Sequence, residues 1–188
     1  MILATVTSDH LIGYEKVRTR LRELRPHLPK NTTCLRVVQP APLNAETLKR
    51  RTCLPCHREY VTVGAALARE RGVSDLALGY VEYQSQWPEQ TLYATSRLRD
   101  LLRDHGVRLH LPVHKLASRA EAVRELVRLN MSAGALEQKC LQQQWNRELP
   151  GDILRQEVDT WEKSTRQQLS HIHHVRLEVI SEGPISEF

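Results

Sequence analysis

The chain has 188 residues and a mass of 21.7 kDa, which suits one domain with a full hydrophobic core and without a disulfide scaffold. Hydrophobic residues make up 40% of it in short runs, far from the roughly 20 apolar residues that cross a bilayer, so a membrane protein is excluded. The first nine residues lack the pattern of a signal peptide, and we expect a cytoplasmic protein.

Strand and helix patterns alternate along the first part of the chain. An apolar run predicts a strand over residues 2–6, and apolar residues at helical spacing predict a helix over 14–28. A run rich in β-branched residues predicts a strand over 32–38. A helix is expected over 55–71, with Gly72 as its stop.

The alternation continues with a strand over 75–80, a helix from Pro88 to Gly106 and a strand over 107–113. In the helix, Leu92 is expected on the inward face with Leu98.

The next helix is expected to open with the S-x-x-E capping box of Ser118 and Glu121. Its inward residues are expected to be Ala122, Val123, Leu126 and Val127. A helix over 153–169 and an added strand over 175–179 complete the chain.

Strands separated by helices in this order predict an α/β fold with a Rossmann-like, doubly wound parallel sheet. We expect an α/β domain over residues 1–150 and an extension over 151–188 that adds the C-terminal helix and strand. In such sheets ligands bind beyond the carboxyl ends of the strands.

The segment from Thr5 to His10 joins the first strand to the first helix. Free amide groups and the helix dipole favour an anion at such a junction. The alternative is structural, because Ser8 and Asp9 also suit an ordinary N-cap.

This segment resembles the PP-loop of ATP pyrophosphatases, SGGxDS. Thr5 stands for the first Ser, Val6 and Thr7 for the glycines, Asp9 for the Asp and His10 for the last Ser. The resemblance implies a HUP-type fold that binds ATP and Mg²⁺, with nucleotide contacts from Thr5, Thr7, Ser8, Asp9 and His10 and a catalytic role for Asp9. The two lost glycines change the shape that the loop can take.

A second landmark of the family is the turn ALGHxxDDxxET. Leu76 to Tyr80 and the later Glu89, Gln90 and Thr91 resemble it, and Gly79 is implied as a nucleotide contact. The acidic pair that holds magnesium is replaced by Glu82 and Tyr83. A non-catalytic member of the family would show such losses.

Cys53 and Cys56 form a CxxC pair at a predicted helix N-terminus, where the helix dipole favours thiolate. With Cys140 they resemble the three cysteines of the PP-loop tRNA 2-thiolation enzymes. The resemblance implies that these three residues are catalytic and hold a 4Fe-4S cluster or a zinc ion. A redox or metal-sensing thiol module is a further reading of the CxxC.

Residues 111–124 resemble the 7-cyano-7-deazaguanine synthases of the same superfamily, in which a strand end leads to a helix start that contains a lysine. Lys115 is that lysine here, and it would neutralise phosphate charge. The four-cysteine zinc site of those enzymes is missing.

Basic residues gather in two segments, one in the first helix and one just before the CxxC. The formal net charge is +5, and such clusters attract RNA through counterion release. The candidate RNA contacts are Lys16, Arg18, Arg22, Arg50 and Arg51. The alternative is a solvated helix face.

Other residues invite a functional reading but favour a structural one. Cys34 lies in an apolar strand, the His171 to His174 stretch would lie at a surface, and Trp161 lies on an apolar helix stripe. His57 could orient a thiolate or act as a fourth ligand.

The residues and the resemblance together predict an ATP-dependent enzyme that modifies a tRNA or a nucleobase precursor by adenylation, with sulfur transfer as one form. The rival is a catalytically degenerate member that binds nucleotide, RNA or a protein partner. The sequence does not predict the oligomeric state.

Overall fold

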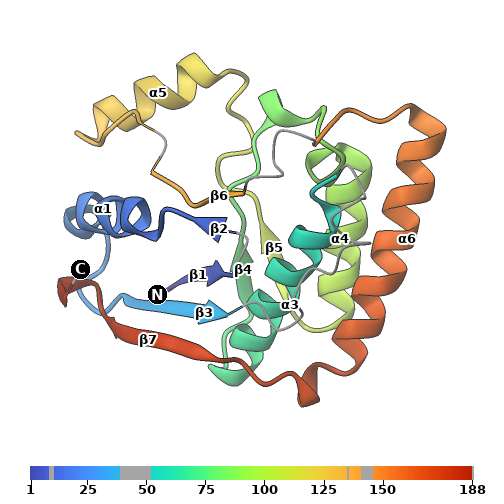
Figure 1. Ribbon diagram of the computed structural model, residues 1–188, viewed down its shortest axis with the longest axis horizontal. Helices are drawn as coiled ribbons and strands as arrows, with labels where there is room; N and C mark the ends of the chain where they lie inside the picture. Colours follow the sequence, from blue (N-terminus) through green and yellow to red (C-terminus); the bar gives the residue numbers. More distant parts are fainter. Residues whose placement is uncertain (9–10, 39–51, 135, 141–145, 188) are drawn as a thin grey trace.

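The computed structural model describes residues 1–8, 11–38, 52–134, 136–140 and 146–187. Within these ranges the helices are α1 (Tyr14–Leu24), α3 (Leu54–Glu70), α4 (Leu92–Asp104), α5 (Arg119–Arg128) and α6 (Gly151–Ser170). The strands are β1 (Ile2–Thr7), β2 (Leu11–Ile12), β3 (Thr33–Val38), β4 (Asp75–Ala77), β5 (Arg108–His110), β6 (Lys139–Cys140) and β7 (Val179–Pro184). Figure 1 shows their arrangement.

The largest sheet has the strand order β1-β3-β7. β1 and β3 are parallel, with Ile2 opposite Thr33 and Thr7 opposite Val38. The last strand, β7, runs antiparallel to β3, with Thr33 opposite Pro184. An added C-terminal strand was expected over residues 175–179, but the strand that pairs with β3 begins at Val179 and continues to Pro184.

The other strands form two separate pairs in the described part of the chain. β4 and β5 are parallel, with Asp75 opposite Arg108, and β2 and β6 are antiparallel. The α/β class is confirmed, and both β1–β3 and β4–β5 have the expected parallel direction. The hydrogen-bonded ladders among these residues do not join into one doubly wound sheet.

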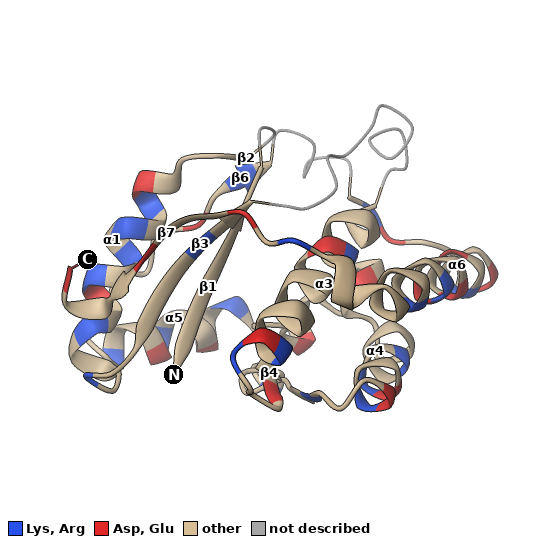
Figure 2. Cartoon of the chain, turned by 90° about the horizontal axis from the view of Figure 1, so that it is seen from below, with Lys and Arg blue, Asp and Glu red and all other residues tan. Residues whose placement is uncertain are grey.

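Figure 2 shows α1 on one side of the β1–β3–β7 sheet and α3, α4 and α6 on the other. The alternation of side chains along β3 explains this arrangement. Leu35 and Val37 pack with Val63 and Leu67 of α3. On the opposite face, Cys34 packs in a separate cluster that includes Leu21 and Val17 of α1 and Ile185 near the C-terminus.

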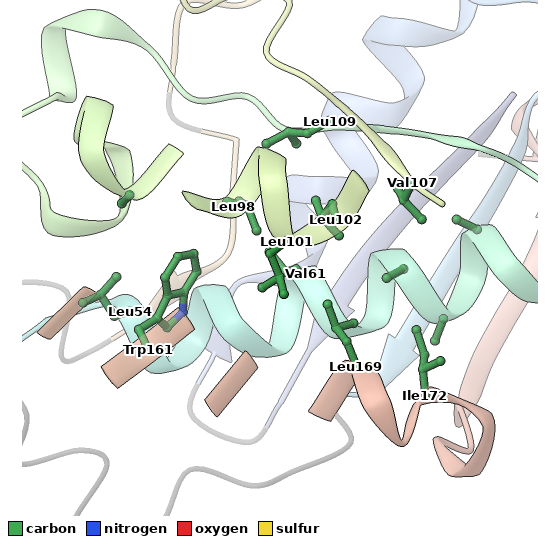
Figure 3. Close-up of a cluster of buried hydrophobic side chains, with 14 of the residues drawn as sticks. Leu54, Val61, Leu98, Leu101, Leu102, Val107, Leu109, Trp161, Leu169 and Ile172 are labelled. Carbon is green, nitrogen blue, oxygen red and sulfur yellow. The ribbon is translucent and has the colours of Figure 1, made fainter. Parts of the chain in front are cut away.

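The main core lies between α3, α4 and α6, beside the β4–β5 pair. Figure 3 shows Val61 of α3 facing Leu98, Leu101 and Leu102 of α4, with Trp161 of α6 near Leu54. The predicted apolar stripe of the last helix is confirmed, because Val158, Trp161 and Thr165 are buried. This helix packs against α3 and α4.

Two predicted inward faces are wrong in part. Leu92 is 74% exposed, because Thr91 is the N-cap of α4 and Pro88–Gln90 forms a separate 3₁₀ turn before it. The capping hydroxyl of Ser118 accepts a hydrogen bond from the Glu121 amide as predicted, yet α5 contains no buried residue. Figure 1 shows α5 at the periphery of the molecule.

The described helices include none that is long and apolar enough to span a membrane.

Gly64 of α3 lies where the helix approaches β4 closely. A Cβ at this position would lie 2.8 Å from Cδ1 of Leu76. We therefore expect Gly64→Val to lower the free energy of unfolding by about 1 to 3 kcal/mol through overpacking, as measured by urea denaturation. In a Leu76→Ala background the cost should shrink, because the clashing methyl groups are gone. An equal cost in both backgrounds would contradict this contact.

Candidate functional site

The junction after β1 differs from the direct strand-to-helix turn that the sequence predicted. The short strand β2 intervenes, and Gly13 is the N-cap of α1, with a positive φ of 86° that favours glycine. Ser8 is therefore not the cap, although its backbone oxygen accepts a hydrogen bond from the Leu11 amide. The free amides of α1 begin several residues later than a PP-loop would place them.

Gln138 connects the junction after β1 to β6, the strand that contains Cys140. The Thr7 hydroxyl donates a hydrogen bond to Oε1 of Gln138 at 2.9 Å, and Nε2 of Gln138 donates one to the Val6 carbonyl at 3.0 Å. Two residues later, Cys140 lies opposite Leu11 in the β2–β6 pair. The end of β1 and Cys140 are thus held in one small substructure.

Cys53 and Cys56 lie at the start of α3, with Cys53 as its N-cap. The expectation that the helix dipole makes them thiolates is wrong, because burial has the larger effect. Burial, together with the charges of Cys140 and Glu59, raises the pKa of Cys56 to about 12. Burial and the nearby Glu89 raise the pKa of Cys53 still further. Both groups are thiols at neutral pH.

Cys140 acts on the pKa of Cys53 and of Cys56, which means that the three sulfur atoms lie in one neighbourhood. The sequence predicted this grouping from a separation of more than 80 residues. However, no three His, Cys, Asp or Glu side chains in the described ranges are arranged to hold a metal ion. A cluster or zinc ion on these cysteines remains a prediction.

His57 lies next to the thiols in α3. Its Nδ1 is 2.6 Å from the Tyr80 hydroxyl, and its ring packs edge-on against Tyr60. Burial lowers the pKa of His57 to about 4, so the imidazole is neutral at pH 7. Burial also raises the pKa of Tyr80, which keeps the phenol protonated. His57 and Tyr80 therefore form a hydrogen bond between two uncharged side chains.

Glu89 is a buried carboxyl group in the same neighbourhood, in the 3₁₀ turn Pro88–Gln90. Its Oε1 accepts a hydrogen bond from Nδ2 of Asn146 at 3.2 Å and lies 3.8 Å from Nε2 of His57. Oδ1 of Asn146 accepts one from the Cys53 amide at 3.1 Å. Asn146 therefore joins the start of α3 to Glu89, and burial raises the pKa of the carboxyl group.

The sequence did not single out Asn146, Tyr60 or Tyr80 as site residues. It used Glu89 only as part of a helix start. The available signal for Glu89 was its place in a polar triplet between Pro88 and the apolar α4. Its burial could not be expected, because acidic residues are seldom fully buried. Asn146 carried no signal, since its role depends on a backbone amide far away in the chain.

Two predicted nucleotide contacts lie elsewhere in the fold. Gly79 is exposed just after β4, and its φ is not positive, so the backbone does not require glycine there. Lys115 is exposed in the turn after β5. Gly79 follows β4 and Lys115 follows β5, whereas Thr5 and Thr7 belong to β1.

Some predicted residues lie outside the described part of the chain, namely Asp9, His10, Arg50 and Arg51. The predicted RNA contacts of α1 are described: Lys16, Arg18 and Arg22 are all exposed. Figure 2 shows several basic segments along this helix. Arg18 is also within 3.4 Å of Glu15, an exposed pair of little energetic weight.

The structural readings of the remaining residues hold where the structure describes them. Cys34 is 2% exposed and Trp161 is 4% exposed, and both belong to hydrophobic clusters. His171, His173 and His174 are exposed. They do not lie on a strand, because residues 172–174 form a 3₁₀ turn.

This set of side chains defines the chemistry that is available at the site. It offers thiols, a neutral imidazole and a carboxyl group, all held at the start of α3 and the turn before α4. The thiols need a base or a cation before they can act as nucleophiles or ligands. Comparison of the chain with models of known protein families, with curated proteins and with solved structures finds no match.

Proposed function

We propose that the protein is an ATP-dependent, PP-loop-type enzyme with a Rossmann-like, HUP-type fold that modifies a nucleobase in tRNA or in a precursor. In the first step a carbonyl oxygen of the base attacks the α-phosphorus of ATP and pyrophosphate leaves. In the second step a sulfur or nitrogen nucleophile attacks the activated carbon and AMP leaves. Both steps depend mainly on positioning and charge stabilisation.

The observation that supports this proposal is the meeting of the β1 junction with all three predicted cysteines. Thr7 is bonded to Gln138, and Cys140 pairs with the residue that follows the junction. Cys140 in turn influences both thiols of the CxxC. Residues expected to bind phosphate and residues expected to carry sulfur thus belong to one site.

The described side chains do not form a ready metal site, so we route no step through a cluster or a metal ion. A cysteine persulfide, formed by an external sulfur donor, would attack the activated carbon, and a second cysteine would then break the S–S bond and form a disulfide with the first. If zinc or iron does bind, the raised thiol pKa requires that protons be released, and binding should weaken as the pH falls. The exposed Lys16, Arg18 and Arg22 of α1 would contact the RNA backbone.

The experiment is ATP-to-AMP turnover with bulk tRNA, on protein prepared anaerobically and assayed for iron and zinc. Asp9→Ala and Cys140→Ser should each lower AMP release or base modification at least about 100-fold, because each removes a group used in the reaction. Cys34→Ala is the matched control, since this cysteine lies in a separate cluster behind β3, and it should keep its activity. Unchanged turnover in Asp9→Ala would remove the catalytic role of the loop.

A second candidate is a catalytically degenerate member of the same fold that binds nucleotide, RNA or a protein partner. The Thr7 hydroxyl favours it, because Gln138 already uses that group where a phosphate would need it. ATP binding without AMP release, in a metal-free preparation, would support this candidate over the enzyme. RNA binding by either candidate should weaken steeply with salt.

A further inference from the structure

One carboxylate oxygen of Glu89 has no hydrogen-bond partner in the part of the chain that the structure describes. The oxygen is Oε2, and the residue is 3% exposed. A buried acceptor without a donor costs about 1 to 3 kcal/mol, and more when it is charged. Such an atom requires an explanation, and a ligand that completes the bonding is one.

The orientation of this carboxyl group is fixed from its other side. Oε1 accepts a hydrogen bond from Nδ2 of Asn146 at 3.2 Å, and Asn146 is itself held by the Cys53 amide. Glu89 also raises the pKa of Cys53 and of Cys56. The carboxyl group is therefore held in one orientation, close to the thiols of Cys53 and Cys56.

Glu59 of α3 is also buried, and its Oε2 likewise lacks a hydrogen-bond partner among the described residues, but its other oxygen is bonded differently. Its Oε1 accepts bonds from the Arg58 guanidinium at 2.8 Å and from Nε2 of Gln168 at 3.0 Å, which ties α3 to α6. A cation thus compensates Glu59 within the fold. Among the described residues, the partners of Glu89 are an amide and a neutral imidazole, and its Oε2 has no donor.

We propose that Oε2 of Glu89 recognises the substrate base by accepting a hydrogen bond from the N–H of a lactam edge, the N–H that adjoins a carbonyl in uracil and guanine. This inference rests on the proposed function, and it narrows the substrate class. The bond would orient the neighbouring carbonyl toward the thiols at the start of α3. Cytosine and adenine lack such an edge and would be rejected.

A neutral donor fits this site better than a cation. Burial raises the pKa of Glu89, and the groups that oppose this shift are a backbone amide and Asn146, with no cation among them. The described carboxyl and thiol groups are not arranged to hold a metal ion. Enzymes read extracted bases through hydrogen bonds to their Watson–Crick edge, and a site built for such a bond strongly rejects an analogue that lacks it.

The test compares nucleosides on the full chain by calorimetric titration. Uridine and guanosine should bind at least about 10-fold more tightly than 3-methyluridine and 1-methylguanosine, in which a methyl group replaces the lactam hydrogen. Cytidine and adenosine should bind as weakly as the methylated nucleosides. This comparison uses the wild-type protein and does not depend on the folding of a variant.

Glu89→Gln should abolish the preference, because the new amide presents either a donor or a weaker neutral acceptor to the base. Glu59→Gln removes a buried carboxylate from the same helix bundle and is the matched control, which should retain the preference. Equal binding of methylated and unmethylated nucleosides to the wild type, absence of binding by both uridine and guanosine, or a preference retained in Glu89→Gln would each overturn the inference.

AMP release with bulk tRNA separates this inference from the proposed function. If the wild type releases AMP and the nucleoside preference is absent, the function stands and the role of Glu89 fails. If AMP is not released but the preference is present and is lost in Glu89→Gln, the recognition stands and the proposed chemistry fails.

Discussion

Replacement of Leu101 by alanine is expected to lower the free energy of unfolding by about 3 to 5 kcal/mol. Leu101 is fully buried in the cluster that joins α3, α4 and α6. Truncation removes three buried carbon atoms and leaves a cavity that the flanking helices cannot fill without moving. Because whole domains are stable by only about 5 to 15 kcal/mol, much of the chain's stability would be lost.

Leu92→Ala is the matched control, since it makes the same change on the same helix. Leu92 is 74% exposed, so the change should stay within about 0.5 kcal/mol. Urea denaturation of both variants, followed by circular dichroism, gives the comparison. A loss below about 1 kcal/mol for Leu101→Ala, or equal losses for both, would show that the cluster is not packed as described.

Acidification from pH 6.5 to pH 4 is expected to destabilise the metal-free protein by up to about 3 kcal/mol through His57 alone. Burial lowers the pKa of His57 from 6.5 to about 4. Between these values the unfolded chain binds a proton that the folded chain does not, so the free energy of unfolding rises with pH. The contribution is present above pH 6.5 and is lost as the pH falls toward 4.

His57→Gln should flatten the pH dependence in this window, because glutamine can keep a hydrogen bond to Tyr80 without titrating. His171→Gln, at an exposed position, should leave the dependence unchanged. The measurement is the free energy of unfolding at half-unit pH steps. Identical slopes for wild type and His57→Gln would mean that the imidazole is not buried as the structure has it.

Periodicity predicted much of the fold because it reports local packing. The stripe of Val158, Trp161 and Thr165 is buried as expected, since α6 lies across α3 and α4. The same rule failed for Val127, which is 63% exposed, because none of the described elements covers that part of α5. An apolar stripe indicates which face would be buried, while the tertiary structure decides whether a partner is there.

The candidate site was predictable only in part for a similar reason. The three cysteines could be found because their spacing carried a resemblance, and the structure places them in one neighbourhood. The burial that makes them thiols depends on residues from distant segments, so the dipole argument gave the wrong protonation state. Neither Asn146 nor the bonding of Glu89 follows from any local pattern.

The bond between Thr7 and Gln138 spans 131 residues of sequence, and this has a consequence for the order of folding. Contacts between distant parts of a chain form late, because the entropy of closing the intervening loop opposes them. The junction after β1 therefore takes its final shape only once β6 has been made and docked. During synthesis β1 can pair with β3 early, whereas the segment after β1 must wait until Gln138 has been made.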